Sequence, residues 1–127
     1  TFIFTKKILE KKSIDIFNYG KMQRDFTYID DIVQGIMGAI KITGRNRHKI
    51  YNLGNSNPEI LLHFIQVIEE NLGIKAKKKF LPIQPGDVEK TFADISDSKK
   101  ELGFSPKTQI NEGVPKFIKW YKEYFKI

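Results

Sequence analysis

Cysteine is absent from this 127-residue sequence, and histidine occurs only twice, as His48 and His63. Without cysteine the chain has no disulfide framework and no thiolate-ligated zinc site. The two histidines lie too far apart for metal-ligand spacing, so we expect no bound metal. No apolar run approaches the roughly 18 residues that a membrane-spanning helix requires, and no signal peptide is recognisable. We therefore expect a soluble, cytoplasmic protein without membrane contact.

The motifs that hold nucleotide cofactors are also missing. The sequence contains neither G-x-G-x-x-G nor G-x-x-G-x-x-G, which would cradle a dinucleotide pyrophosphate, and no G-x-x-x-x-G-K-[ST] loop. It lacks a Tyr-x-x-x-Lys pair as well, since Tyr121 and Tyr124 have lysines nearby but not at that spacing. We expect no catalytic residue and no cofactor-binding residue in this chain, and we assign no catalytic role to either histidine.

The sequence does contain enough apolar material for one folded domain. Apolar residues make up 40% of the chain and aromatic residues 13%, as is typical of globular domains. The net charge of +7 has two interpretations. In the first, the positive charge binds an anion such as nucleic acid or a nucleotide phosphate. In the second, the lysines simply cover the solvent-exposed faces of helices. An acidic part of a longer protein would also balance the positive charge. The helical pattern begins abruptly at Thr1, and we interpret this as the sign of a fragment.

Apolar periodicity predicts an α/β fold that is mostly helical, with few and short strands. The predicted helices are 2–11, 29–40, 60–72, 96–102 and a final one that Thr108 would cap. The predicted strands are 14–17, 24–28, 49–54, 75–81 and 92–93. So few strands do not complete a doubly wound sheet. We therefore predict a small lobe, residues 1–127 as a single domain, that packs on something larger.

Several local features refine this prediction. Asn18 and Gly20 tolerate positive φ, so the first two strands would form a small hairpin. Within 49–54, Ile50 and Leu53 are candidate core residues. The helix 29–40 is amphipathic, with one apolar face. That face comprises Ile29, Ile32, Val33, Ile36, Met37 and Ile40.

Helix ends carry their own signals. Asp30 and Asp31 fall in the first turn of helix 29–40, where carboxylates stabilise the helix and are expected to cap it. Ser96 is predicted to cap the short helix that follows it. Pro115 lies inside the last apolar pattern, so it would either kink that helix or mark its true start.

Two polar segments are candidates for ligand binding. The first contains Arg24 beside an aromatic strand, where a forked guanidinium suits a phosphate. The alternative is an ordinary surface ion pair of Arg24 with Asp25 or Asp30. The second segment is Gln84-Pro85-Gly86-Asp87, whose aspartate suits sugar hydroxyls. The alternative there is a simple turn in which Asp87 bonds its own backbone.

In order along the chain, the segments IDIFNYGKMQRDFTYIDDIVQGI, YNLGNSNP, LPIQPGDVEKTFADISDSKKELGFSPKTQINEGV and FIKWYKEYF closely resemble the C-terminal part of extended short-chain dehydrogenases. The resemblance spans essentially the whole chain and is nearest to UDP-glucuronate 4-epimerases of bacterial polysaccharide synthesis. It implies the UDP-sugar-binding lobe of an enzyme whose N-terminal Rossmann domain binds NAD. Such epimerases oxidise C4 of the sugar and return the hydride to its other face. The resemblance implies no catalysis by this chain alone.

The resemblance also implies roles for particular residues. Arg24 matches the arginine that grips the UDP diphosphate, and Asp87 matches the aspartate that binds ribose hydroxyls. Phe17 matches the aromatic position beside the uracil. Gln84 stands where related galactose epimerases have arginine, which leaves Arg24 as the main charge partner of the phosphates. A second set, Asn52, Gly54 and Asn55, matches a strand-end motif that we interpret as structural.

Three other functions remain open. A sugar-nucleotide dehydratase or decarboxylase of the same superfamily would share this lobe. A non-catalytic remnant or interaction module is a second alternative. Nucleic-acid binding is a weaker one, because only Phe26 and Tyr28 offer aromatic rings on a basic strand, and we expect no nucleic-acid partner.

Overall fold

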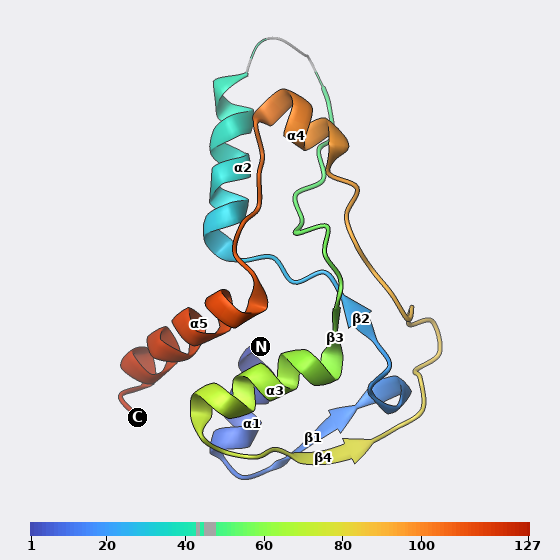
Figure 1. Cartoon of the computed structure of the whole chain (residues 1–127), viewed down its shortest axis with the longest axis vertical. Coiled ribbons are helices and arrows are strands. Elements are labelled where there is room, and N and C mark those ends of the chain that lie inside the picture. The colour runs from blue at the N-terminus through green and yellow to red at the C-terminus, as the bar shows by residue number, and fades with distance from the viewer. Residues whose placement is uncertain (43, 45–47) are drawn as a thin grey trace.

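The computed structural model describes residues 1–42, 44 and 48–127. In this part of the chain five α-helices, one 3₁₀ turn and four short strands are formed (Figure 1). The helices are α1 (Phe2–Leu9), α2 (Ile29–Lys41), α3 (Leu61–Leu72), α4 (Ser96–Leu102) and α5 (Ile110–Phe125). The strands are β1 (Ser13–Ile16), β2 (Gln23–Arg24), β3 (Glu59–Ile60) and β4 (Lys77–Phe80), and the 3₁₀ turn η1 is Phe17–Gly20. The predicted α/β class with short strands is confirmed.

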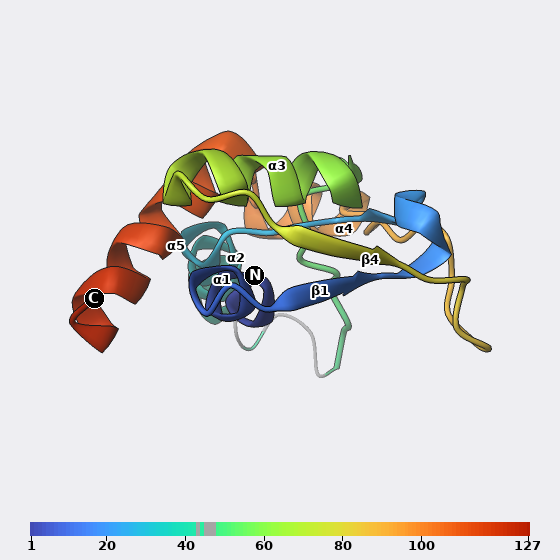
Figure 2. The same cartoon turned by 90° about the horizontal axis from the view of Figure 1, so that it is seen from below.

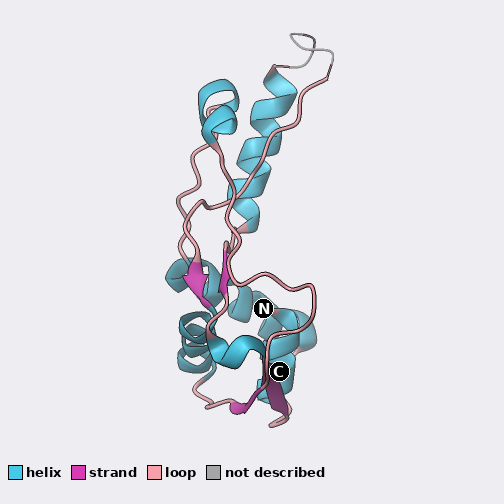
Figure 3. Cartoon of the chain, turned by 90° about the vertical axis from the view of Figure 1, so that its right-hand side faces the viewer, coloured by secondary structure: helices cyan, strands magenta, loops and turns pink. Residues whose placement is uncertain are grey.

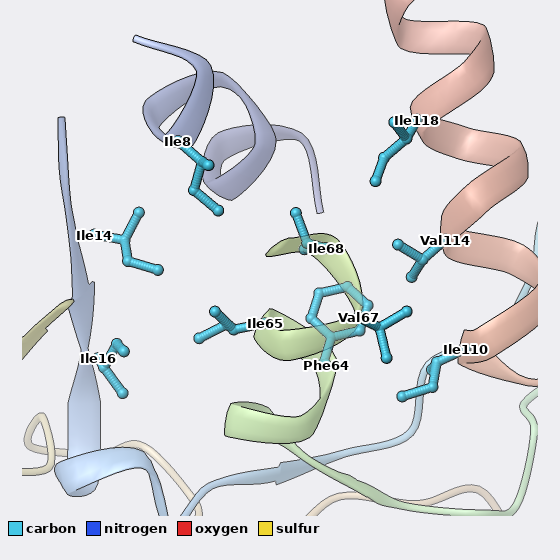
Figure 4. Close-up of a cluster of buried hydrophobic side chains, with 10 residues drawn as sticks. All are labelled: Ile8, Ile14, Ile16, Phe64, Ile65, Val67, Ile68, Ile110, Val114 and Ile118. Carbon is cyan, nitrogen blue, oxygen red and sulfur yellow. The ribbon is translucent and has the colours of Figure 1, made fainter. Parts of the chain in front are cut away.

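The larger of two hydrophobic cores lies between β1, α1, α3 and α5 (Figure 4). Ile14 and Ile16 of β1 point toward α3, because alternate residues of a strand face one side. On the other side of α3, its Val67 meets Val114 and other apolar residues of α5. Burying each such side chain contributes about 1.5–3 kcal/mol. The predicted apolar faces of α3 and α5 are therefore confirmed as core-facing, except for Ile60 and Phe125 at their ends, which are 50% and 43% exposed.

The smaller core lies at the far end of the elongated molecule, where α2 and α4 lie side by side (Figure 3). It contains Ile95, Leu102 and Phe104, with Leu53 packed against it. Gly35 and Gly38 let α2 approach this core closely, because a Cβ on Gly38 would lie 2.5 Å from the carbonyl oxygen of Leu102. Leu53 is thus confirmed as a core residue. Ile50, however, is 78% exposed, so its assignment to the core was wrong.

The strand pairing differs from the predicted hairpin. β1 runs parallel to β4, with Ser13 opposite Lys77 and Ile16 opposite Phe80, and α3 lies along one face of the pair (Figure 2). Asn18 and Tyr19 both adopt positive φ, and the Tyr19 amide donates to the carbonyl of Leu81 at 3.0 Å. This 3₁₀ turn leads the chain away from β1 instead of folding it back.

Of the predicted strand at 24–28 only Arg24 is in a strand, because β2 comprises Gln23 and Arg24. β2 pairs antiparallel with β3, with Arg24 opposite Glu59.

The predicted strands at 49–54 and 92–93 are not formed. Asp25 joins the two segments instead, because its Oδ2 accepts hydrogen bonds from the amides of Ser56 and Ala93, both at 3.0 Å. A side chain thus satisfies backbone groups that a strand ladder would otherwise pair.

The predicted helix caps also need correction. Asp31 does not cap α2 but accepts bonds from the amides of Lys107 and Thr108, at 3.2 and 3.0 Å. Thr108 is likewise not the N-cap of α5, which is Gln109. In the short helix α4, Ser96 donates to Asp94 instead of capping.

Pro115 lies inside α5. The helix begins five residues earlier and continues to Phe125, so this proline does not mark its start.

Candidate functional site

Arg24 ends β2, and its guanidinium is held by three acceptors. Nη1 donates to the carbonyl of Gln23 at 2.9 Å and to the carbonyl of Glu89 at 3.2 Å. Nη2 donates to Oδ1 of Asp87 at 2.7 Å. The side chain is 27% exposed, so the fork is fixed in position yet remains accessible from solvent. Neither Asp25 nor Asp30 is its partner within the described residues, and the predicted local ion pairs are wrong.

Asp87 closes a turn that Gln84 begins. The amide of Asp87 donates to the carbonyl of Gln84 at 3.1 Å, and Gly86 adopts a φ of +81° that the turn requires. Oδ1 of Asp87 accepts from the amide of Val88 at 2.9 Å as well as from Arg24. Its contacts within the described residues all use Oδ1. The carboxylate therefore stabilises its own turn, as the alternative of a simple turn predicted, and these contacts leave Oδ2 available as an acceptor.

Glu89 is a member of this cluster that the sequence did not indicate. Its carbonyl accepts from the Gln23 amide at 2.8 Å and from Arg24, and its side chain accepts from Asn18 Nδ2 at 3.3 Å. Glu89 thus connects η1, β2 and the loop that carries Asp87. In sequence it is an ordinary acidic residue in an exposed loop, and no spacing signal distinguishes it.

Phe17 and Gln84 are placed differently from the ion pair. Phe17 is the first residue of η1. Together with Phe4 and Lys7 of α1 and with Leu61, it lines a cavity of about 480 Å³. Gln84 is exposed at the start of the Asp87 turn. The structure therefore brings Arg24 and Asp87 into contact and places Gln84 beside them. Phe17 is not among the residues that the structure shows in contact with Arg24 or Asp87.

The Asn52-Leu53-Gly54-Asn55 segment contacts the chain around Ala93 and α4 and helps to hold the fold together. Asn52 donates to the carbonyl of Asp94 at 3.1 Å, and its own carbonyl accepts from the Ser98 hydroxyl. A Cβ on Gly54 would lie 2.5 Å from Ala93. Nearby, hydrogen bonds from Ser96 lower the pKa of Asp94. These contacts fit the structural interpretation of the motif.

Known proteins share this fold and these segments. A family model described as GDP-mannose 4,6 dehydratase matches residues 3–117, and the chain belongs to that family. Within it, the chain corresponds to the C-terminal portion of extended short-chain dehydrogenases.

The relatives include two curated proteins and one solved structure of particular interest. Protein CapI of Staphylococcus aureus is 40% identical over 98% of this chain and 42% of its own length. UDP-glucuronate 4-epimerase 5 of Arabidopsis thaliana is 42% identical over 98% of this chain and 32% of its own length. The Bacillus cereus UDP-glucuronic acid 4-epimerase, solved with UDP-glucuronic acid and NAD, is 33% identical with a TM-score of 0.82. The match covers 93% of this chain and 38% of that structure.

The chain therefore spans only about a third to two-fifths of the length of these relatives. Among the described residues no helix is long and apolar enough to cross a membrane. The same residues contain no group of three or more histidine, aspartate or glutamate side chains that would hold a metal ion.

Proposed function

We propose that this chain is the UDP-sugar-binding part of an NAD-dependent UDP-sugar 4-epimerase whose substrate is UDP-glucuronate. The observation that carries the proposal is the contact between Arg24 and Asp87, because it joins the two residues to which the family resemblance assigns the phosphates and the ribose. The relatives named UDP-glucuronate 4-epimerase align over nearly all of this chain, which supports the choice of substrate.

Each site residue has a physical role in this proposal. Arg24 offers the edge of its fork to the diphosphate, since its backbone partners hold Nη1 and leave donors on Nε and Nη2. Asp87 accepts the ribose hydroxyls through Oδ2. Phe17 provides apolar contact for the uracil, and Gln84 adds a neutral amide beside the phosphates. Arg24 is then the main positive charge at the diphosphate.

NAD belongs to another part of the proposed enzyme. This chain carries no glycine-rich phosphate loop, so its residues do not fit the pyrophosphate of that cofactor. NAD would supply the hydride acceptor for the sugar, while the residues of this chain bind and orient the nucleotide. The chain alone is then inactive as an epimerase.

A titration of the 127-residue chain tests the nucleotide site. UDP added to the ¹⁵N-labelled chain should shift the amide resonances of residues 17–24 and 84–89 in a saturable manner. Inorganic phosphate at the same concentration is the control, because it presents charge without the nucleoside. Absence of any UDP-dependent shift in these two segments would contradict the proposed function.

A dehydratase or decarboxylase of the same family is the second candidate, and the description of the family model supports the dehydratase. The complete enzyme distinguishes the two with UDP-glucuronate. A 4-epimerase converts it to UDP-galacturonate and releases no carbon dioxide. A decarboxylase releases carbon dioxide, and a dehydratase forms neither UDP-galacturonate nor carbon dioxide, so measuring both products distinguishes the three.

The proposed reaction has a cellular role as well. We place it in the cytoplasm, where UDP-galacturonate would supply acidic sugar units for a surface polysaccharide. Deleting the gene should remove galacturonate from the hydrolysed polysaccharide. An unchanged sugar composition would contradict this role without affecting the enzymatic proposal.

A further inference from the structure

The cavity beside Phe17 has the lining of a small-molecule site. Its volume of about 480 Å³ lies within the range of about 300–1,000 Å³ that is usual for such sites. Two charged side chains, Lys7 and Asp15, belong to a lining that is otherwise mostly apolar. The apolar members are Phe2, Ile3, Phe4, Phe17 and Leu61. A few polar groups in an apolar pocket usually fix the orientation of a ligand.

Lys7 and Asp15 come from different elements. Lys7 lies in the last turn of α1, and Asp15 lies on β1, on the opposite face from the buried Ile14 and Ile16. Lys7 Nζ is 3.6 Å from Asp15 Oδ2, and the two side chains are 36% and 41% exposed. This distance is longer than that of an ordinary hydrogen bond. The ammonium therefore keeps donors, and the carboxylate keeps acceptors, for a ligand that enters the cavity.

The cavity adjoins the proposed phosphate and ribose site. Phe17 lines the cavity, and the next residue, Asn18, donates to the side chain of Glu89 at 3.3 Å. The carbonyl of Glu89 accepts from Arg24 at 3.2 Å. These contacts connect the cavity to the Arg24–Asp87 pair. A nucleotide whose diphosphate contacts Arg24 therefore has this cavity beside it for the base.

We propose that Lys7 and Asp15 select uracil as the base of the nucleotide. Lys7 donates to O4 of uracil, and Asp15 accepts from its N3–H. Cytosine has an amino group in place of O4 and no hydrogen on N3, so it would place a donor against Lys7 and an acceptor against Asp15. A site with hydrogen-bonding groups that an analogue leaves unpaired rejects that analogue. The inference rests on the proposed function and adds the residues that determine its base specificity.

Titrations of the 127-residue chain with UDP and CDP, followed by NMR, test this selection. The two ligands share the ribose and the diphosphate, so the ratio of their dissociation constants reports on the base alone. Lys7→Met removes the ammonium and keeps an unbranched side chain, and Asp15→Ala removes the acceptor. Lys6→Met is the matched control, because Lys6 is the exposed neighbour of Lys7 on α1 and its replacement removes the same charge.

We expect the natural chain to bind UDP about tenfold more tightly than CDP. Lys7→Met and Asp15→Ala should each reduce this preference to less than about threefold, chiefly by weakening the binding of UDP. Lys6→Met should keep the full preference. The dispersion of the amide spectrum and the Tm of each variant verify that it is folded.

Three results would overturn the inference. The first is equal affinity of the natural chain for UDP and CDP. The second is a preference for UDP that both Lys7→Met and Asp15→Ala leave intact. The third is a preference for CDP, because the two side chains would then contact the base in the opposite order.

A modified ligand tests Asp15 independently. 3-Methyl-UDP lacks the N3 hydrogen, and we expect the natural chain to bind it about tenfold less tightly than UDP. Asp15→Ala offers more room and no acceptor, so it should bind the two ligands with nearly equal affinity. If the variant discriminates between them as strongly as the natural chain does, Asp15 does not contact N3.

The same titrations separate the two proposals. If UDP shifts the resonances of residues 17–24 and 84–89 but the variants keep the preference for UDP over CDP, only the base selection is wrong. If neither nucleotide binds, the proposed function is wrong, and the base selection that rests on it is wrong as well.

Discussion

The guanidinium of Arg24 donates to the carboxylate of Asp87 at 2.7 Å, although the two residues are 63 positions apart. One residue ends a two-residue strand, and the other closes a glycine-containing turn. Because both side chains are about 30% exposed, at 27% and 32%, the pair is not a desolvated structural ion pair. The pair therefore contributes little to stability. Its geometry instead places the guanidinium group of Arg24 and a carboxylate oxygen of Asp87 side by side.

Replacing Arg24 should weaken UDP binding more than uridine binding. Arg24→Ala removes a charge-assisted hydrogen bond to the diphosphate, so we expect a loss of about 1.5–3 kcal/mol in UDP affinity. This corresponds to roughly 10- to 150-fold in Kd. Uridine, which has no phosphate, should be affected much less. NMR titrations with both ligands measure the difference.

Arg24→Lys is the conservative control for this prediction. It keeps the charge but loses the planar fork, so its affinity for UDP should lie between those of the wild type and Arg24→Ala. Full affinity in Arg24→Ala would show that the diphosphate lies elsewhere.

Replacing Asp87 should weaken uridine and UDP binding together. Asp87→Ala removes the acceptor proposed for the ribose hydroxyls, and we expect a loss of about 1–2 kcal/mol for both ligands. 2′,3′-Dideoxyuridine provides a ligand-side control, since it lacks the hydroxyls and should bind the wild type and the variant equally. If Asp87→Ala lowers the affinity for uridine no more than it lowers the affinity for the dideoxy ligand, the assigned role is contradicted.

The buried carboxylate of Glu69 should stabilise the fold. It is 4% exposed and accepts from the Ala76 amide at 2.7 Å, from the Lys78 ammonium, and from Lys75 at 3.5 Å. These contacts fix the turn between α3 and β4. Glu69→Gln removes the charge, so we expect a loss of about 1–3 kcal/mol in the free energy of unfolding. Glu70→Gln on the exposed side is the control, with a change within about 0.5 kcal/mol.

The same carboxylate predicts a pH dependence. Burial alone would raise the pKa of Glu69, but hydrogen bonds from Lys78 and Ala76 and the neighbouring lysines outweigh it and lower the pKa below its ordinary value of 4.5. The unfolded chain binds a proton at higher pH than the folded chain does, so the contribution is complete above that ordinary value. It is lost as the pH falls through the lower folded pKa. Acid unfolding of Glu69→Gln should lack this component, and an identical acid profile would contradict the prediction.

Close packing at Gly38 should make it intolerant of a side chain. Alanine favours helices over glycine by about 1 kcal/mol, but a Cβ here would lie 2.5 Å from a backbone oxygen of Leu102. The backbone cannot move aside cheaply, so Gly38→Ala should destabilise the chain by about 1–3 kcal/mol. Met37→Ala, on the exposed side of the same helix, should change stability by less than about 0.5 kcal/mol in the chain alone. Urea unfolding measures both, and a stabilised Gly38→Ala would refute the packing argument.

The sequence by itself determined the helices and the class of fold. The recurrence of apolar residues at helical spacing located α3 and α5, and Gly73 ended α3 in the left-handed conformation as glycine does. It also identified Arg24 and Asp87 as candidates through the resemblance of their segments. These properties depend on local spacing, which is visible in the chain itself.

Only the tertiary structure decided which distant groups meet. The parallel pairing of β1 with β4, the use of Asp25 and Asp31 to hold loops, and the role of Glu89 beside Arg24 all join residues far apart in sequence. The outward direction of the α2 apolar face was decided in the same way, because the glycines on its other side allow the closer approach. Periodicity reveals that a helix has an apolar face, but the packing of the whole chain determines what that face contacts.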